Sequence, residues 1–181
     1  MGVPKRLADT IANTKINLTE EDILEKLCDR LRWPKQYPWG QPSVEAINEN
    51  STKNQNFFEL DNYINSPKCI KYYEEGYTLI LSNIGYITKD TAKIQTMLNN
   101  CFKKHINCNF YFGKGKKDVS FKTHKHDYAV MIKNIYGEST WLIDGKELNL
   151  TNQNTLFFNR DTNHEVIAIK DKKLSMTLNL N

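Results

Sequence analysis

From residue 106 to its end the chain is a succession of short β-type segments separated by turn residues. The segments are INCNFYFG, SFKTHKHDYAVMIKN, GESTWLIDGKELNL, TLFFNR, HEVIAIKD and KLSMTLNLN. Alternating polar and apolar residues predict strands, and the Asp144-Gly145 pair between two such runs favours a tight hairpin turn. Many short strands at even spacing are typical of a small β-sandwich or barrel, of which the jelly roll is one closed form.

The N-terminal part of the chain shows helical spacing instead. Thr19 precedes acidic residues and an apolar series with helical spacing, so a helix is expected to begin there, with Ile23, Leu24, Leu27 and Leu31 on one face. Residues 34–56 are rich in Pro, Gly and Asn, and they predict a long loop or connector. Residues 76–84 predict a strand. Thr88 then begins a second helix with one apolar face, formed by Ile94, Met97, Leu98 and Phe102.

Composition limits the class of protein. A chain of 181 residues with 39% apolar content predicts a single core. The net charge is +4, and the lysines are scattered among acidic residues and Asn. The chain therefore has no block of like charge, which argues against nucleic-acid binding. No apolar run is long enough to span a bilayer. The four cysteines show no CxxC spacing, and the N-terminus lacks the apolar stretch of a secretory signal, so we expect a cytoplasmic protein.

Three of the four histidines fall in the β-rich region. His124 and His126 are two residues apart, so in a strand both side chains point to the same side, while Lys125 and Asp127 point to the other. His164 follows at the start of another predicted strand. Imidazoles from two adjacent strands suit a catalytic Fe, Zn, Cu or Ni ion. The alternative without a metal is a pair of surface histidines on an edge strand.

These residues carry a resemblance to a known family. The stretches EEGYTLILSNI, NCNFYFGKGKKDVSFKTHKHDYAVMIKNIYGESTW and NTLFFNRDTNHEV resemble the cupin-type JmjC oxygenases of the ribosomal-oxygenase kind. The resemblance implies a mainly β fold with N-terminal helices (α+β), built on a double-stranded β-helix, the cupin or jelly-roll core. Residues 1–56 would form an N-terminal helical arm and connector, and residues 57–181 a JmjC-like cupin domain.

The resemblance also implies a metal site and a cosubstrate. His124 and His164 match the two histidine ligands, His126 stands where the family has aspartate, and Fe(II) with 2-oxoglutarate would hydroxylate a peptide or protein side chain. Another divalent metal could take the place of iron. Asn134 stands where the family often has a polar amide.

Two positions depart from the family pattern. Three neutral imidazoles would leave the metal its full double charge. Glu138 and Ser139 follow Gly137 where the family has the basic residue that holds 2-oxoglutarate. The remaining candidates for that role are basic side chains elsewhere, namely Lys133, Arg160 and Lys173. We therefore expect 2-oxoglutarate to bind weakly or not at all.

The sequence leads to a functional prediction with open alternatives. The first is a non-haem iron oxygenase acting on a peptide, a protein or an amino-acid-derived small molecule. The second is a three-histidine cupin dioxygenase, isomerase or lyase that does not use 2-oxoglutarate, and the third is a non-catalytic cupin binding module. Tyr111 and Phe121 are expected to line the pocket. The resemblance is also compatible with a homodimer.

Overall fold

The computed structural model describes residues 3–29, 33–35, 43–48, 50–115 and 121–180. Four helices lie in the N-terminal part: α1 (Lys5–Asn13), α2 (Glu20–Cys28), α3 (Ser66–Glu74) and α4 (Lys89–Phe102). The early strands are β1 (Val44–Ile47), β2 (Lys53–Asn54) and β3 (Thr78–Leu81). The later strands are β4 (Asn107–Lys114), β5 (Ala129–Tyr136), β6 (Ser139–Ile143), β7 (Lys146–Leu150), β8 (Thr155–Phe158), β9 (His164–Ile169) and β10 (Lys172–Leu180).

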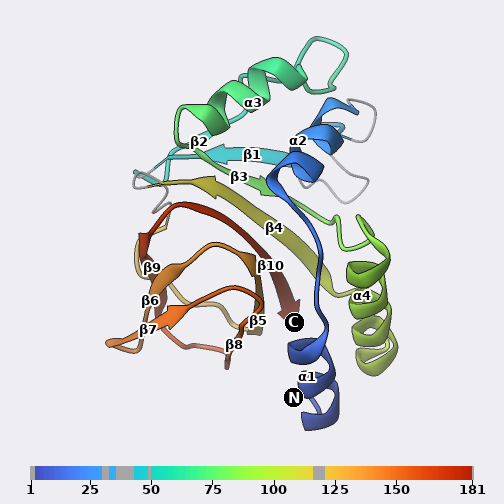
Figure 1. The fold of residues 1–181 in the computed structure, drawn as a ribbon, viewed down its shortest axis with the longest axis vertical. Helices are drawn as coiled ribbons and strands as arrows, with labels where there is room; N and C mark the ends of the chain where they lie inside the picture. Colours follow the sequence, from blue (N-terminus) through green and yellow to red (C-terminus); the bar gives the residue numbers. More distant parts are fainter. Residues whose placement is uncertain (1–2, 30–32, 36–42, 49, 116–120, 181) are drawn as a thin grey trace.

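The strands form two antiparallel sheets. The large sheet has the order β2-β1-β3-β4-β10-β5-β8, and the small sheet has the order β7-β6-β9. Figure 1 shows the small sheet on one side of the curved large sheet, while α2, α3 and α4 lie on the other side. The protein is thus mainly β with a few helices, and its two facing sheets form a jelly-roll core.

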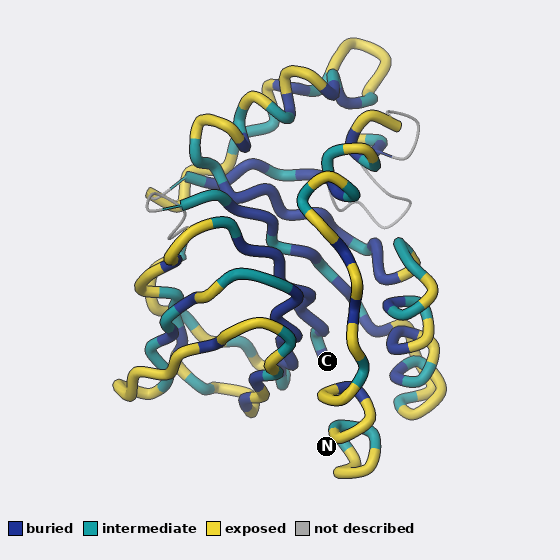
Figure 2. Tube along the Cα trace, viewed as in Figure 1, coloured by how far each residue is buried: buried dark blue, intermediate teal, exposed yellow. Residues whose placement is uncertain are grey.

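The main hydrophobic core lies between the large sheet and the helices. Alternation along the strands places one set of residues on this side, so that Phe110 and Phe112 of β4 meet Leu174 and Met176 of β10, all four fully buried. Figure 2 shows that the middle strands of the large sheet are the most continuously buried part of the chain. A smaller apolar cluster lies between the sheets and is formed by Val130, Ile132, Trp141, Leu150, Leu156 and Phe158.

Local sequence signals explain where the helices begin. Thr19 caps α2 in a capping box with Asp22, and Thr88 caps α4 in the same way with Thr91. Asn65 accepts a hydrogen bond from the Lys68 backbone at the start of α3. The predicted starts of two helices are confirmed. Leu31, which the sequence also placed in the first helix, lies outside the described residues.

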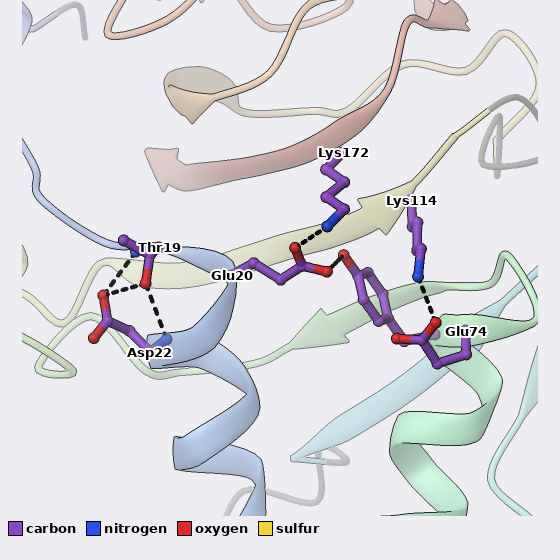
Figure 3. A network of polar contacts seen from close by, with 7 residues as sticks. Thr19, Glu20, Asp22, Glu74, Lys114 and Lys172 are labelled. Atoms are coloured by element: carbon purple, nitrogen blue, oxygen red, sulfur yellow. Dashed lines mark hydrogen bonds and ion pairs between the residues drawn. The ribbon is translucent and has the colours of Figure 1, made fainter.

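A polar network joins α2 and α3 to the large sheet. Glu20 accepts a hydrogen bond of 2.8 Å from the Tyr73 hydroxyl and pairs with Lys172 of β10. Lys114 of β4 pairs with Glu74 of α3, as the close view in Figure 3 shows. The helices are therefore fixed to the sheet by charge as well as by apolar packing.

One sequence expectation is wrong. Residues 34–56 were expected to form a loop, yet Val44–Ile47 forms β1, which pairs along its whole length with β3, and Lys53–Asn54 forms β2. Only four residues separate Ser43 from Asn48, and such a short segment shows too little alternation to indicate a strand. In contrast, the six β-type segments after residue 106 each contribute a strand, and the Asp144-Gly145 turn joins β6 to β7 with both residues at positive φ.

Candidate metal centre

Three imidazoles converge on one point between the two sheets. One ring nitrogen from each of His124, His126 and His164 lies within 4.8 Å of the others. The ring centroids are 4.4 Å apart for His124 and His164, 5.0 Å for His124 and His126, and 5.1 Å for His126 and His164. The three residues that the sequence singled out therefore form one cluster.

The backbone holds two of these residues directly together. His124 donates to the carbonyl oxygen of His164 at 3.1 Å, and His164 donates back to that of His124 at 2.9 Å. The sequence placed His124 and His126 inside a regular strand, but β5 begins only at Ala129, and this isolated bridge is the β-pairing of the segment. The two histidines still share one side, as predicted. Both imidazoles are partly buried, while Lys125 and Asp127 are exposed.

In two of the three histidines, a hydrogen bond occupies Nδ1 and leaves Nε2 for a metal. Nδ1 of His124 is 2.9 Å from the Lys122 carbonyl oxygen, and Nδ1 of His164 is 2.9 Å from that of Thr162. A carbonyl only accepts, so each Nδ1 carries the proton and each Nε2 has a free lone pair. This arrangement is the usual support for histidine ligands.

Burial favours the neutral form of two of the three imidazoles. His164 is 4% exposed, and burial lowers its pKa to about 4, with a further decrease from the nearby His124 and His126 and a partial increase from the Thr162 carbonyl. Burial also lowers the pKa of His126, as does His124, whereas Asp127 opposes that change. Neutral imidazole is the form that binds a metal, so burial favours metal binding by His126 and His164.

Aromatic side chains enclose the cluster. The Phe158 ring lies 4.2 Å from the His164 ring, and the Trp141 ring lies 6.4 Å from it. Tyr128 stacks on His126 at 4.8 Å with an angle of 5° between the rings. These contacts restrict the rotation of the ligands and keep water from one side of the site.

The cluster lies in the wall of a cavity of about 480 Å³ between the two sheets. Tyr111 and Phe121 line it, as the sequence predicted. The floor is the face of the large sheet that points away from the helices, and its polar side chains are Thr78, Ser82, Asn107, Asn109, Ser175, Thr177 and Asn179. This volume is within the usual range for small-molecule sites.

Asn134 and Ser139, the two inner-surface candidates, are buried but not among the residues that line the cavity. The Asn134 amide donates to the Gly137 carbonyl oxygen at 2.6 Å, and Ser139 Oγ accepts a hydrogen bond of 3.1 Å from the Trp141 indole. In this structure both side chains support the β5–β6 turn and the Trp141 ring.

The three basic candidates fall in different places. Lys133 points to the helix side of β5, where it donates to the Ala12 and Gln153 carbonyl oxygens and burial lowers its pKa. Arg160 is exposed and pairs with its neighbour Asp161. Lys173 alone of the three lines the cavity, 5% exposed, with its ammonium 5.1 Å from the Trp141 ring centre.

Two features of the site were missed from the sequence. Phe158 and the polar floor line the cavity without having been predicted. The signal for the floor is present in β10, where Ser175, Thr177 and Asn179 alternate with Leu174, Met176, Leu178 and Leu180. A polar face on a central strand with no exposure to bulk solvent indicates an internal cavity.

Comparisons with known proteins do not identify the activity. The family profile described as the AraC-like ligand binding domain matches residues 110–178. No protein of curated function shows significant sequence similarity to the chain. Solved structures similar to it include a cupin superfamily protein from Desulfitobacterium hafniense, with 13% identity, a TM-score of 0.38, and coverage of 41% of this chain and 66% of that one.

Two further similar structures are enzymes. A DMSP lyase from Ruegeria pomeroyi has 13% identity and a TM-score of 0.38, with coverage of 42% of this chain and 38% of that one. A salicylate 1,2-dioxygenase from Pseudoaminobacter salicylatoxidans has 8% identity and a TM-score of 0.38, with coverage of 41% and 20%. This chain thus spans less than half of either enzyme.

Within the described residues, no helix combines the length and the apolar character needed to cross a membrane.

Proposed function

We propose that this chain is a metal-dependent cupin-type oxygenase that binds Fe(II) through His124, His126 and His164 and oxidises a small molecule without 2-oxoglutarate. The observation that carries the proposal is the convergence of three imidazole nitrogens within 4.8 Å in the wall of a cavity. The cavity volume of about 480 Å³ favours a small substrate over a folded protein. The JmjC resemblance supports iron, but the missing basic residue argues against the usual cosubstrate.

The roles of the protein residues follow from their positions. When bound, Fe(II) would supply dioxygen chemistry, and another divalent ion would supply Lewis-acid chemistry. Nε2 of His124 and His164 would bind the metal while the Lys122 and Thr162 carbonyls hold each Nδ1 proton. Phe158 and Trp141 lie against the His164 ring and would shield that side of the cluster from water.

The case against 2-oxoglutarate rests on what surrounds the expected clamp. Ser139 is bound to the Trp141 indole, and the ammonium of Lys133 is held by two carbonyl oxygens outside the cavity. A charge-assisted pair contributes about 1.5–3 kcal/mol, so losing the pair at position 139 lowers affinity roughly tenfold to a hundredfold unless Lys173, which lines the cavity, replaces it. Calorimetric titration of the metal-loaded protein under argon should show no micromolar binding of 2-oxoglutarate. A micromolar Kd would restore the 2-oxoglutarate-dependent hydroxylase, with Lys173 as its clamp.

Metal binding tests the proposal directly. One equivalent of Fe(II) under argon, or of Mn(II), Ni(II) or Zn(II), should raise the melting temperature of untagged protein, because a ligand bound only by the native state stabilises it. His164→Ala should lose most of this rise. His105→Ala is the matched control, since His105 is the one histidine outside the cluster. Equal responses of wild type and His164→Ala would show that the cluster binds no metal.

Dioxygen consumption then separates the three functional classes. An oxygenase that does not use 2-oxoglutarate should consume dioxygen with its substrate alone. A three-histidine lyase or isomerase should turn over without dioxygen, and a binding module should bind a ligand and release it unchanged.

A further inference from the structure

The floor of the cavity is a polar surface made by alternate residues of the large sheet. Ser175 and Thr177 of β10 lie beside Tyr111 and Asn109 of β4 in register. All four line the cavity, whereas the residues between them on β10 pack into the core under the helices. These polar side chains face the cavity, whose lining also includes the apolar side chains of Ile80, Val130 and Trp141.

Several of these groups have their hydrogen-bonding capacity available. Among the described residues, no side-chain hydrogen bond involves Ser82, Ser175, Thr177 or Asn179, although the first three are buried. Their oxygen atoms are reachable from the cavity, where water or a ligand can bond them. Hydroxyl and amide groups both donate and accept, which matches ligand hydroxyl groups, since these also do both. The floor is therefore suited to a ligand with several hydroxyl groups.

The charges around the cavity favour an anion. Lys173 is buried in the lining beside Trp141, and three neutral imidazoles would leave the full charge of a bound cation. Of the two acidic residues in the lining, Glu45 pairs with Lys53 at 3.0 Å, and Glu165 is partly exposed next to His164. Electrostatics at the inner wall therefore attract a carboxylate and repel an ammonium group.

We propose that the cavity binds a small polyhydroxylated carboxylate, with its hydroxyl groups on the Ser175–Thr177–Asn179 face of β10 and its carboxylate toward Lys173 and the histidine cluster. This inference rests on the proposed function, because it names the substrate class of the same site. Four same-face positions on β10, from Lys173 to Asn179, span about 20 Å at 3.3–3.4 Å per residue. A six-carbon chain is shorter than this row, so its hydroxyl groups would reach only the positions nearest to its carboxylate end.

Three probes of equal carbon number separate the two parts of the proposal. D-gluconate carries both the hydroxyl groups and the carboxylate, hexanoate carries the carboxylate alone, and D-sorbitol carries hydroxyl groups alone. Calorimetry on metal-free protein and on protein loaded with redox-inert Zn(II) should show gluconate binding at least tenfold tighter than either partial probe. Equal affinity for all three probes, or no gluconate binding, would overturn the proposal.

Variants assign each part to its residues. Thr177→Val, which keeps the shape, should weaken gluconate about threefold to tenfold and leave hexanoate unchanged. Lys173→Met should weaken gluconate and hexanoate about tenfold to a hundredfold and leave sorbitol unchanged. Thr155→Val is the matched control, because the Thr155 hydroxyl is buried without a partner outside the cavity. A loss of gluconate affinity in Thr155→Val equal to that in Thr177→Val would contradict the assignment.

The failure of this proposal differs from the failure of the metal assignment. If the protein binds no metal but selects gluconate, the substrate class stands and the proposed oxygenase does not. If it binds metal through the histidines but does not distinguish the probes, the metal centre stands and the substrate class is wrong. Ser175→Ala gives a second test of the floor if Thr177→Val is too unstable to purify, and it should also weaken gluconate alone.

Discussion

The two faces of the large sheet differ in chemistry although the same strands build them. On the helix side, Leu174 and Met176 of β10 are fully buried in a continuous apolar core. On the cavity side, their neighbours Ser175 and Thr177 point into an enclosed polar space. Apolar burial is the main stabilising contribution to folding, and unsatisfied polar groups contribute little to it. The comparison indicates that one face provides most of the stability while the other lines a cavity.

The largest expected effect compares two adjacent aromatic residues of β4. Phe112 is fully buried and stacks on Tyr73 with ring centres 4.0 Å apart, whereas Tyr111 lines the cavity. Phe112→Ala should lower the free energy of unfolding by about 3–5 kcal/mol, through lost burial and a cavity in the core. Tyr111→Ala should cost roughly 1–2 kcal/mol, because the new space joins an existing cavity. Urea denaturation followed by circular dichroism measures both losses.

The stability loss in Phe112→Ala should not affect metal binding. This variant should retain the metal-induced rise in melting temperature, since its side chain lies on the far side of the sheet from the histidines. Equal losses of stability in Phe112→Ala and Tyr111→Ala would contradict the claim that the helix-side face provides most of the stability.

An intermediate effect is expected at the one ammonium on the helix side of β5. The buried Lys133 donates to the carbonyl oxygens of Ala12 in α1 and of Gln153. Lys133→Met keeps the length of the side chain but leaves both acceptors without this donor, so the free energy of unfolding should fall by about 2 kcal/mol. The metal-induced shift should stay the same. A loss of metal binding in Lys133→Met would show that the two faces are coupled.

The smallest effect concerns acid stability on the helix side. Burial tends to raise the pKa of Glu20, but hydrogen bonds from Lys172 and Tyr73 outweigh it and leave the pKa lowered from 4.5. The unfolded state therefore binds a proton before the native state does, so the stabilisation from Glu20 is present above pH 4.5 and is lost as the pH falls through the lowered value. Glu20→Gln should flatten this part of the pH profile by on the order of 1 kcal/mol.

Glu74→Gln is the matched control for this measurement. Glu74 belongs to the same network through Lys114, but its side chain is 49% exposed, so its ion pair contributes little in water. Melting temperatures between pH 3 and pH 7 compare the two variants with the wild type. A steeper acid loss in Glu20→Gln than in the wild type would contradict the assigned direction.

The β-rich half of the fold was predictable because its local signals agree. Alternation and turn residues each indicated the strands after residue 106, and the Asp144-Gly145 hairpin formed as expected. β1 was not predictable, because four residues after a Pro-rich stretch carry no usable period. Its place in the sheet depends on pairing with β3, which is distant in the sequence.

The candidate site was predictable in its ligands and less so in its surroundings. Spacing placed His124 and His126 on one side and His164 at the start of another strand, and the resemblance matched all three to ligand positions, so they were expected together. Neither signal could separate Lys133 from Lys173, because the face on which each lysine lies depends on strand register, and a shift of one residue would exchange the faces. The structure places only Lys173 in the cavity.

The backbone bridge between His124 and His164 affects the rates at which a metal would bind and dissociate. These residues are 40 positions apart in the chain (164 − 124 = 40), and their main chains already exchange two hydrogen bonds. The conformational entropy of closing a loop of this length is lost when the protein folds, not when a cation binds. Binding therefore requires little ordering, and escape of a bound cation is tied to local opening of this crossing. The residence time of a metal would then follow the opening rate of the bridge between His124, before β5, and His164, at the start of β9.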